Sequence, residues 1–321
     1  MTQACDSTAV SSWHMSRKAY RQVEVMVALF IWLGLFHFNT IVGAIAIYHL
    51  PSKTSVTVLV VMLTLVVIPV SESQFGRKVA TFIARIAPTY FPIKMVYEDY
   101  QALDPKKAYI VALEPHHVFP ISAVALSPLS GLFPLEKIRI LGSSALTYVP
   151  FVRHIWRWLS MAPATRKQFS NLLASGTSCV IVPGGLQESL LLEQSREVLF
   201  LKRRLGFVRL AVESNVPIIP IFSFGQKDVY SYWFPRSSFH TALSRKLMFA
   251  PMLFWGRWGT PIPHQKPMTL VVGKPVPVPA GEASLDAAVQ KMHAEFIATV
   301  ERLYEQHKCG VGFSAVPLVI T

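Results

Sequence analysis

The most restrictive feature of this sequence is a pair of apolar segments close to its N-terminus. The first runs from Val23 to Leu50 and the second from Ser55 to Val70, and both are almost free of charge. A helix needs about 20 apolar residues to cross the hydrocarbon core of a bilayer. The first segment is long enough to cross, and the second can serve as the return limb. The pattern therefore predicts a membrane hairpin over residues 23–70, with a buried helical pair of a soluble fold as the alternative.

Basic side chains flank the hairpin on both outer sides, and only Lys53 lies between its limbs. Because Lys and Arg beside membrane spans stay on the cytosolic side, both termini are expected to be cytosolic. A signal peptide is not indicated, because the apolar stretch is too long and no small-residue cleavage site follows it. The flanking basic residues are Arg17, Lys18 and Arg21 on one side and Arg77, Lys78, Arg85 and Lys94 on the other; the polar residues inside the hairpin, expected to pack against the partner limb or to mark an interfacial break, are His37, Asn39 and His49.

The amino-acid composition limits both the class of protein and the kind of binding partner to expect. Only 15% of the residues are charged and 52% are hydrophobic, whereas soluble domains carry about 25% charge, so a disordered or acidic protein is excluded. The net charge of +13 favours a polyanionic partner such as lipid headgroups, a phosphorylated substrate or nucleic acid. Nucleic acid is not expected, because the basic residues are scattered and no recognition motif is present. The 3 cysteines are far apart, which indicates a reducing compartment.

Beyond the hairpin, short β-branched segments alternate with helical patterns. This alternation predicts an α/β domain with a mixed, largely parallel sheet and flanking helices. Ligands of such sheets bind at the carboxyl ends of the strands. The domain organisation we expect is an N-terminal tail over 1–22, the hairpin over 23–70 and a catalytic domain over 71–321. The expected strands are Ala108–Leu113, Lys137–Leu141, Ser178–Val182, Pro217–Phe222 and Met268–Gly273, and the expected helices are Arg166–Ser175, Val198–Ser214 and Ser284–Lys308.

Two of the expected strand ends carry unusual chemistry. One strand is followed by Glu114-Pro115-His116-His117, and another by Pro183-Gly184-Gly185-Leu186-Gln187-Glu188. A histidine is a suitable general base because its ordinary pKa is about 6.5, and Pro115 would fix the backbone before it. A Gly-Gly turn lets main-chain amides approach a substrate closely. Glu188 could orient the His116 imidazole and stabilise its cation.

Each of these features also has an ordinary structural interpretation, as a hydrogen-bonding histidine or a tight turn. Several other classes of active site are not indicated, because the sequence lacks their motifs. The sequence has no Gly-x-Ser-x-Gly elbow, no P-loop and no Gly-x-Gly-x-x-Gly loop. It also has no His-Glu-x-x-His or Cys/His cluster, so no metal is expected.

A resemblance to a known family goes further than any single motif. The segments that carry it are, in order, YIVALEPHHVFPI, LTYVPFVRHIWRWL, VIVPGGLQES, RRLGFVRLA, PIIPIFSFGQ and VVGKPVPV. Together they resemble the type-2 diacylglycerol O-acyltransferase family over nearly the whole chain. Animal members carry His-Pro-His-Gly at the first site and plant members Glu-Pro-His-Ser, so Glu-Pro-His-His is similar to the plant-type branch. The resemblance makes His116 the catalytic histidine, with His117 in place of the usual small residue.

The resemblance implies transfer of an acyl group from acyl-CoA to the hydroxyl of a diacylglycerol, without a cofactor. Monoacylglycerol or a long-chain alcohol are alternative acceptors, and a non-catalytic droplet or membrane protein is a further alternative. A fold like that of the glycerolipid acyltransferases is implied, although Ile121 stands where their His-based pattern has an acid. The implied location is the endoplasmic reticulum membrane, with lipid droplets and a homo-oligomer left open.

The remaining site residues follow from those substrates. The phosphates of CoA call for basic side chains. The turn residues Glu114, Pro115, His117, Pro183, Gly184 and Gly185 are expected to contact substrate. For the phosphates we expect Arg203, Arg204 and Arg209, with Lys202 beside them and with Arg153, His154, Arg166 and Lys167 as weaker candidates; a solvated or membrane-facing basic surface is the alternative. The aromatic segments Tyr230–Phe234 and Met252–Trp258 would lie at a membrane interface, line an acyl tunnel or pack in the core.

Overall fold

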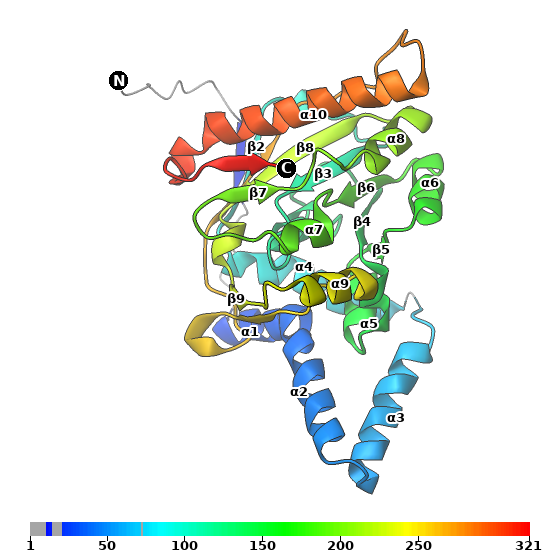
Figure 1. Cartoon of the computed structure of the whole chain (residues 1–321), viewed down its shortest axis with the longest axis vertical. Coiled ribbons are helices and arrows are strands. Elements are labelled where there is room, and N and C mark those ends of the chain that lie inside the picture. Colours follow the sequence, from blue (N-terminus) through cyan, green and yellow to red (C-terminus); the bar gives the residue numbers. More distant parts are fainter. Residues whose placement is uncertain (1–10, 15–20, 72) are drawn as a thin grey trace.

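The computed structural model of the chain describes residues 11–14, 21–71 and 73–321. Its centre is an eight-stranded sheet. Across the sheet the strands are β1 (Ser11–His14), β2 (Ile93–Tyr97), β11 (Met268–Val272), β8 (Ile218–Phe224), β3 (Ile110–Glu114), β6 (Ser178–Ile181), β4 (Ile138–Gly142) and β5 (Met161–Pro163) (Figure 1). β1 is antiparallel to β2 and β11 is antiparallel to β8, whereas all other neighbours run parallel. The mixed, largely parallel sheet predicted from the sequence is confirmed.

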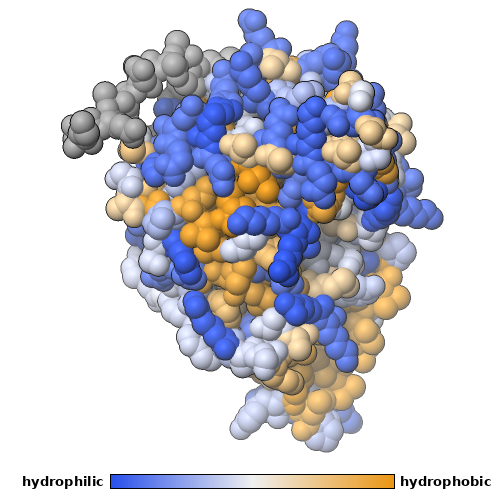
Figure 2. Space-filling model, turned by 45° about the horizontal axis from the view of Figure 1, so that its top comes forward, coloured by the Kyte–Doolittle hydropathy of each residue, from blue (hydrophilic) through white to orange (hydrophobic). Residues whose placement is uncertain are grey.

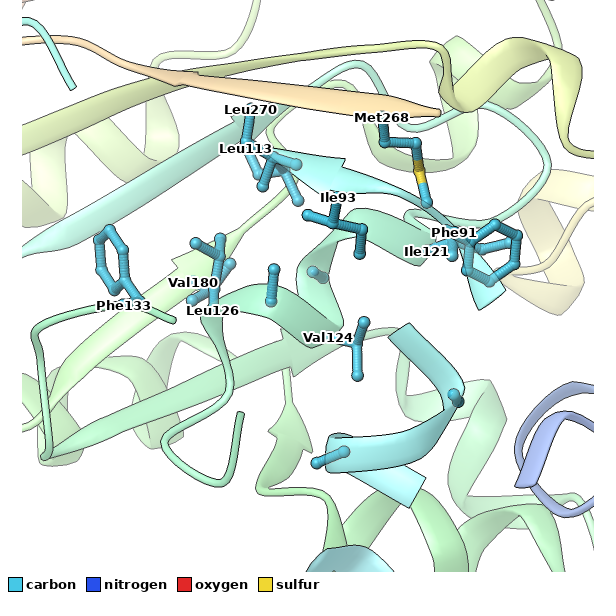
Figure 3. Packing of buried hydrophobic residues seen from close by; sticks show 14 of the residues in the cluster. Phe91, Ile93, Leu113, Ile121, Val124, Leu126, Phe133, Val180, Met268 and Leu270 are labelled. Atoms are coloured by element: carbon cyan, nitrogen blue, oxygen red, sulfur yellow. The ribbon is translucent and has the colours of Figure 1, made fainter. Parts of the chain in front are cut away.

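Helices cover both faces of this sheet. Successive side chains of a strand point to opposite faces. In β3, Val111 and Leu113 accordingly lie in one core, shown in part in Figure 3, and Ile110 and Ala112 lie in the other. The first core is covered by α1 (Gln22–Leu29) and α4 (Gln74–Tyr90), and the second by α6 (Arg166–Ala174), α8 (Gly206–Glu213) and α10 (Leu285–His307). The other helices and strands are α5 (Val152–Trp158), α7 (Gly185–Ser189), α9 (Ser238–Leu247), β7 (Glu197–Leu199) paired with β12 (Leu318–Ile320), and β9 (Ser231–Trp233) paired with β10 (Leu253–Trp255).

The structure corrects one expected helix. The helices expected over Arg166–Ser175 and Ser284–Lys308 are α6 and α10. The expected helix over Val198–Ser214 is wrong, because this segment starts in β7 and becomes helical only at Gly206. β7 pairs in parallel with β12 at the opposite end of the sequence. The local spacing of apolar residues does not depend on a strand so distant in sequence, so the prediction from sequence was wrong here.

The N-terminal apolar segments form a bent helix and a shorter one. α1 continues through a π-helical turn, Phe30–Gly34, into α2 (Leu35–Tyr48). Together they make one helix of 27 residues that is long and apolar enough to cross a membrane. α3 (Lys53–Val67) follows with 15 residues. α1 lies against the domain, whereas α2 and α3 lead away from it (Figure 1), and the protruding end is mainly hydrophobic (Figure 2).

Polar contacts fasten α2 and α3 to the domain. Asn39 Nδ2 donates hydrogen bonds to the carbonyl oxygens of Leu35 at 2.7 Å and Pro150 at 2.9 Å. His37 Nε2 lies 2.8 Å from the carbonyl oxygen of Phe254 in β10. These side chains therefore join α2 to the domain instead of to the other limb. At the end of α3, the Arg153 guanidinium of α5 donates to the carbonyl oxygens of Leu65, Val66 and Ile68.

Candidate active site

Three adjacent parallel strands bring the candidate residues to one edge of the sheet. β3 lies between β8 and β6 and runs parallel to both. Their carboxyl ends therefore meet at the same edge, where α/β folds bind ligands. His116 follows β3, Gly184 follows β6 and Gln226 follows β8. The sheet thus brings together the two sequence motifs that the sequence alone could only place at separate strand ends.

The imidazole of His116 is held in a defined tautomer. Its Nδ1 lies 2.8 Å from the carbonyl oxygen of His117 and 2.9 Å from the hydroxyl of Ser189. A carbonyl oxygen only accepts hydrogen bonds, so Nδ1 carries the proton and Nε2 keeps its lone pair. Burial lowers the pKa of His116, which keeps the ring neutral at neutral pH. These are the properties of a general base whose reactive atom is Nε2.

Glu188 lies beside His116, but its contact differs from the predicted one. Its Oε1 accepts a hydrogen bond from the main-chain N–H of His116, and its Oε2 accepts one from the N–H of Phe200 at 3.4 Å. The prediction that Glu188 orients the imidazole directly is therefore wrong in its geometry. The carboxylate holds the backbone that carries the ring, and the main-chain carbonyl of His117 orients the ring itself.

Glu114 forms a buried carboxyl pair with Glu188. Glu114 is 0% exposed, and its Oε1 accepts a hydrogen bond from the N–H of Gly184 at 3.3 Å. Burial and the neighbouring Glu188 raise the pKa of Glu114 well above its usual range, and burial raises the pKa of Glu188 to about 7. Two carboxyls so close in a dry site do not both ionise, so the pair holds a proton near neutral pH. Glu114 and the buried Pro115 lie beneath the surface, which corrects their predicted contact with substrate.

Both glycines of the turn are required for different reasons. A Cβ on Gly184 would lie 1.9 Å from Oε2 of Glu188, so any larger residue displaces that carboxylate. Gly185 has a φ of +51° in the left-handed region, which favours glycine. The N–H of Gly184 already donates to Glu114, so it does not point to a substrate, which corrects the predicted approach of this amide. Pro183 and Gly185 remain partly exposed.

His117 turns away from His116. Its φ of 53° directs the chain into the left-handed region, and its Nε2 lies 3.1 Å from Oε2 of the buried Glu197. His117 also lines a cavity of about 300 Å³, so it stays a candidate for contact with substrate. The other residues that line this cavity are Glu193, Gln194, Lys227, Asp228, Tyr230, Ser231, Tyr232, His264 and Lys266.

The predicted arginine cluster is dispersed. Arg204 donates to the carbonyl oxygen of Gly184 at 3.0 Å, so it supports the turn instead of facing solvent as a phosphate ligand. Arg209 pairs with Asp286 of α10, and Arg203 is exposed. Arg203 and the partly exposed Arg209 therefore keep their predicted role as a proposal, whereas the contact of Arg204 with the turn corrects its role. Among the weaker candidates, Arg153 holds the end of α3 and Arg166 pairs with Glu213 at 2.8 Å.

The structure adds a residue that the sequence did not single out. Gln226 is buried, and its Oε1 accepts hydrogen bonds from the N–H and hydroxyl of Ser122 at 2.9 and 2.7 Å. Its Nε2 donates to the carbonyl oxygen of Pro115 at 2.6 Å. Gln226 therefore fixes both ends of the loop that carries His116. The signal for it was its position after the expected strand Pro217–Phe222, which lies beside the strand that precedes His116. In the part of the chain that the structure describes, no group of His, Cys, Asp and Glu side chains could hold a metal ion.

Comparison with known proteins gives the same family along most of the chain. The family model for diacylglycerol acyltransferase matches residues 46–321. A bovine (Bos taurus) protein, diacylglycerol O-acyltransferase 2-like protein 6, is 30% identical over 76% of this chain and 80% of its own length. Mouse (Mus musculus) acyl-CoA wax alcohol acyltransferase 2 is 32% identical over 70% of this chain and 72% of its own.

Two further similar proteins are acyltransferases whose names give other acceptors. Human 2-acylglycerol O-acyltransferase 3 is 31% identical over 69% of this chain and 71% of its own. A solved structure, the 1-acyl-sn-glycerophosphate acyltransferase PlsC from Thermotoga maritima, is 14% identical with a TM-score of 0.42, covering 89% of this chain and 97% of that one. On the match of the family model and of the bovine relative, the chain belongs to the diacylglycerol acyltransferase family and is an acyltransferase of lipid biosynthesis.

Proposed function

We propose that this acyltransferase moves a fatty acyl group from acyl-CoA to the free hydroxyl of a diacylglycerol and so makes triacylglycerol. The observation that carries the proposal is the tautomer of His116. Its Nδ1–H is bound to the carbonyl oxygen of His117 at 2.8 Å, so Nε2 is the basic atom. His116 as a residue is partly exposed at the carboxyl edge of the sheet, where we expect the acceptor hydroxyl to approach.

The chemistry needs no covalent enzyme intermediate, because a thioester is already activated. The acceptor oxygen attacks the thioester carbonyl while His116 Nε2 takes its proton. A C–O bond forms, the C–S bond breaks, and the CoA thiolate receives the proton back from Nε2. The alcohol has a very high pKa, so proton removal must be concerted with attack. A well-placed general base typically contributes about 10²- to 10⁴-fold to such a step.

A hydrophobic acceptor requires a site beside a membrane. We infer that α2 and α3 insert as a hairpin, since many of their outward side chains are apolar and exposed, among them Ile41 at 55%, Leu63 at 64% and Val67 at 72%. The basic flanks support cytosolic termini in the endoplasmic reticulum, and lipid droplets are a second expected location. Protease added outside sealed microsomes should then cleave near both termini, and protection of either terminus contradicts the hairpin.

The central test replaces the base and varies the acceptor. Microsomes carrying the His116→Ala variant receive labelled acyl-CoA with diacylglycerol, monoacylglycerol or a long-chain alcohol. Loss of turnover by about 10² or more at unchanged membrane abundance supports the role of His116. His307→Ala, at the end of α10, is the matched control and should transfer normally. Retained turnover in His116→Ala removes the residue from catalysis, and a preference of the wild-type protein for another acceptor replaces diacylglycerol with that acceptor.

A further inference from the structure

The segment between Asp228 and Glu282 contains no acidic residue. It includes β9, α9 and β10, and it is rich in exposed apolar side chains. Among them, Trp233 is 57% exposed, Phe239 is 75% exposed and Trp258 is 77% exposed. Single exposed apolar residues are ordinary, but a group of large ones indicates an interaction site. We call residues 231–258 the platform. Its basic residues are Arg236, Arg245, Lys246 and Arg257.

The platform is continuous with the hydrophobic helices. β9 and α9 lie at the end of the domain from which α2 and α3 emerge (Figure 1). His37 of α2 contacts β10 directly, since its Nε2 lies 2.8 Å from the carbonyl oxygen of Phe254 and the two rings are 4.3 Å apart between centroids. A surface next to inserted helices is held close to the bilayer, so its occupant must be compatible with lipid.

The charge and the aromatic side chains of the platform suit a lipid surface. Tryptophan prefers the boundary between headgroups and acyl chains, because its ring is apolar and its N–H is polar. Arg257 lies over the ring of Trp258, with its guanidinium carbon 4.5 Å from the ring centroid. Such basic side chains are attracted to anionic headgroups. An acidic protein partner would meet the same charge, but it would have to share this face with the membrane that holds α2 and α3.

The platform also connects the bilayer side of the domain to the loop of His116. The ring of Phe254 packs against Phe119 with centroids 5.0 Å apart, and Tyr230 packs against Phe254 at 5.2 Å. Phe119 is in the loop between His116 and Ser122 that Gln226 fixes. These aromatic contacts join the platform to the loop that carries the base.

We propose that the platform lies on the cytosolic surface of the bilayer as a second membrane contact, with Trp233, Phe239 and Trp258 among the headgroups and its basic residues on anionic lipids. The inference rests on the proposed membrane attachment of α2 and α3. It extends that proposal, because it assigns a lipid-binding role to a segment far from the hairpin in sequence.

The test measures how deeply a label on the platform sits in the membrane. Phe239→Cys carries a fluorescent label in the full chain, reconstituted in vesicles of phosphatidylcholine and phosphatidylserine with or without brominated acyl chains. Cys5 and Cys309 are replaced by Ser, and Cys179 is retained because its thiol is buried. Leu285→Cys is the matched control, since Leu285 is also exposed, at 40%, but begins α10 on the opposite side of the domain (Figure 1).

We expect bromine to quench the label at position 239 at least about twofold more than the label at 285. Equal quenching at both positions overturns the platform. Acyl transfer is measured in the same vesicles. Normal transfer with an unquenched label at 239 rejects the membrane contact of the platform and leaves the proposed acyl transfer intact. A quenched label with no transfer rejects the proposed acyl transfer and leaves the membrane contact intact. Lys246→Gln combined with Arg257→Gln should weaken quenching only when phosphatidylserine is present, and unchanged quenching there removes the anionic lipids from the proposal.

Discussion

The Nδ1 atom of His116 lies 2.8 Å from the carbonyl oxygen of His117, the next residue in the chain. The left-handed backbone of His117, with a φ of 53°, accompanies this contact. In a Ser-His-Asp triad a carboxylate fixes the tautomer of the base. Here the main chain fixes it, and the carboxylate of Glu188 binds the backbone N–H of His116 instead. The base is therefore set by the conformation of its own turn.

The pH dependence of acyl transfer should reflect the burial of His116. The ring must be neutral to accept a proton, and burial lowers its pKa. Turnover should therefore fall on acidification with a midpoint below the ordinary histidine pKa of about 6.5. The measurement is kcat/KM for the acceptor against pH, alongside a check that the protein stays folded at each pH. A midpoint above the ordinary value contradicts the assignment.

The buried carboxyl pair should make the protein less stable as the pH rises. The pKa of Glu188 is raised from 4.5 to about 7. In the unfolded chain the carboxyl loses its proton near the lower value, but the folded pair retains it. The folded state then binds more protons between about pH 4.5 and 7, so its free energy of unfolding falls across that window. The pKa of Glu114 is raised as well, so Glu114→Gln removes one of the two carboxyls and should make this decline shallower, as measured by Tm against pH in detergent. Glu193→Gln, at a partly exposed carboxylate paired with Arg196, should not, and an equally steep decline in Glu114→Gln would falsify the account.

The Gly184→Ala substitution should abolish most turnover. The added methyl group would overlap Oε2 of Glu188, only 1.9 Å away, and would push the carboxylate off the His116 N–H. Gly206→Ala is the control, because a Cβ there has no atom within 4 Å and alanine favours helices by up to about 1 kcal/mol over glycine. Turnover and detergent-solubilised Tm are compared for both variants. Normal turnover in Gly184→Ala would show that the position of the Glu188 carboxylate does not depend on this glycine.

Gln226→Leu should lower kcat without raising the KM for acyl-CoA. Leucine cannot replace the hydrogen bonds to Ser122 and Pro115, and each buried polar group left unpaired costs about 1–3 kcal/mol. The loop that positions His116 would shift while the acyl-CoA contacts stay. Steady-state kinetics in microsomes separate kcat from KM, and the exposed Gln290→Leu in α10 should behave like the wild type. A rise in KM with unchanged kcat would instead place Gln226 in substrate binding.

Arg153→Met should loosen the end of α3. The guanidinium caps the carbonyl oxygens of Leu65 and Ile68, which an α-helix leaves without intrahelical partners. We expect faster proteolysis near residues 68–71 in microsomes than in the wild type. Arg157 lies one turn further along α5 and is exposed. Arg157→Met removes the same charge but leaves the contact of Arg153 with α3 in place, so this variant should be cleaved at the normal rate. Equal cleavage of the two variants argues against the role of Arg153.

The sequence by itself determined the elements with a local signal. The first apolar segment appears as α1 and α2 and the second as α3, because hydropathy is a property of consecutive residues. The β-branched segments appear as β3, β4, β6, β8 and β11, and the helix over Ser284–Lys308 appears as α10, since each carries a local signal, a short β-branched run or a helical spacing of apolar residues. The two motifs were also placed correctly at strand ends, because each directly follows such a segment.

Only the tertiary structure decided which strand ends are neighbours and what each polar side chain contacts. The order β8-β3-β6 brings Gln226, His116 and Glu188 together, and β7 forms only because β12 lies beside it. Glu188 binds a backbone N–H, and Arg209 pairs with Asp286. These partners are 72 and 77 residues apart in sequence, and hydrogen bonds and ion pairs act over a few ångströms in space, so no pattern of neighbouring residues encodes them.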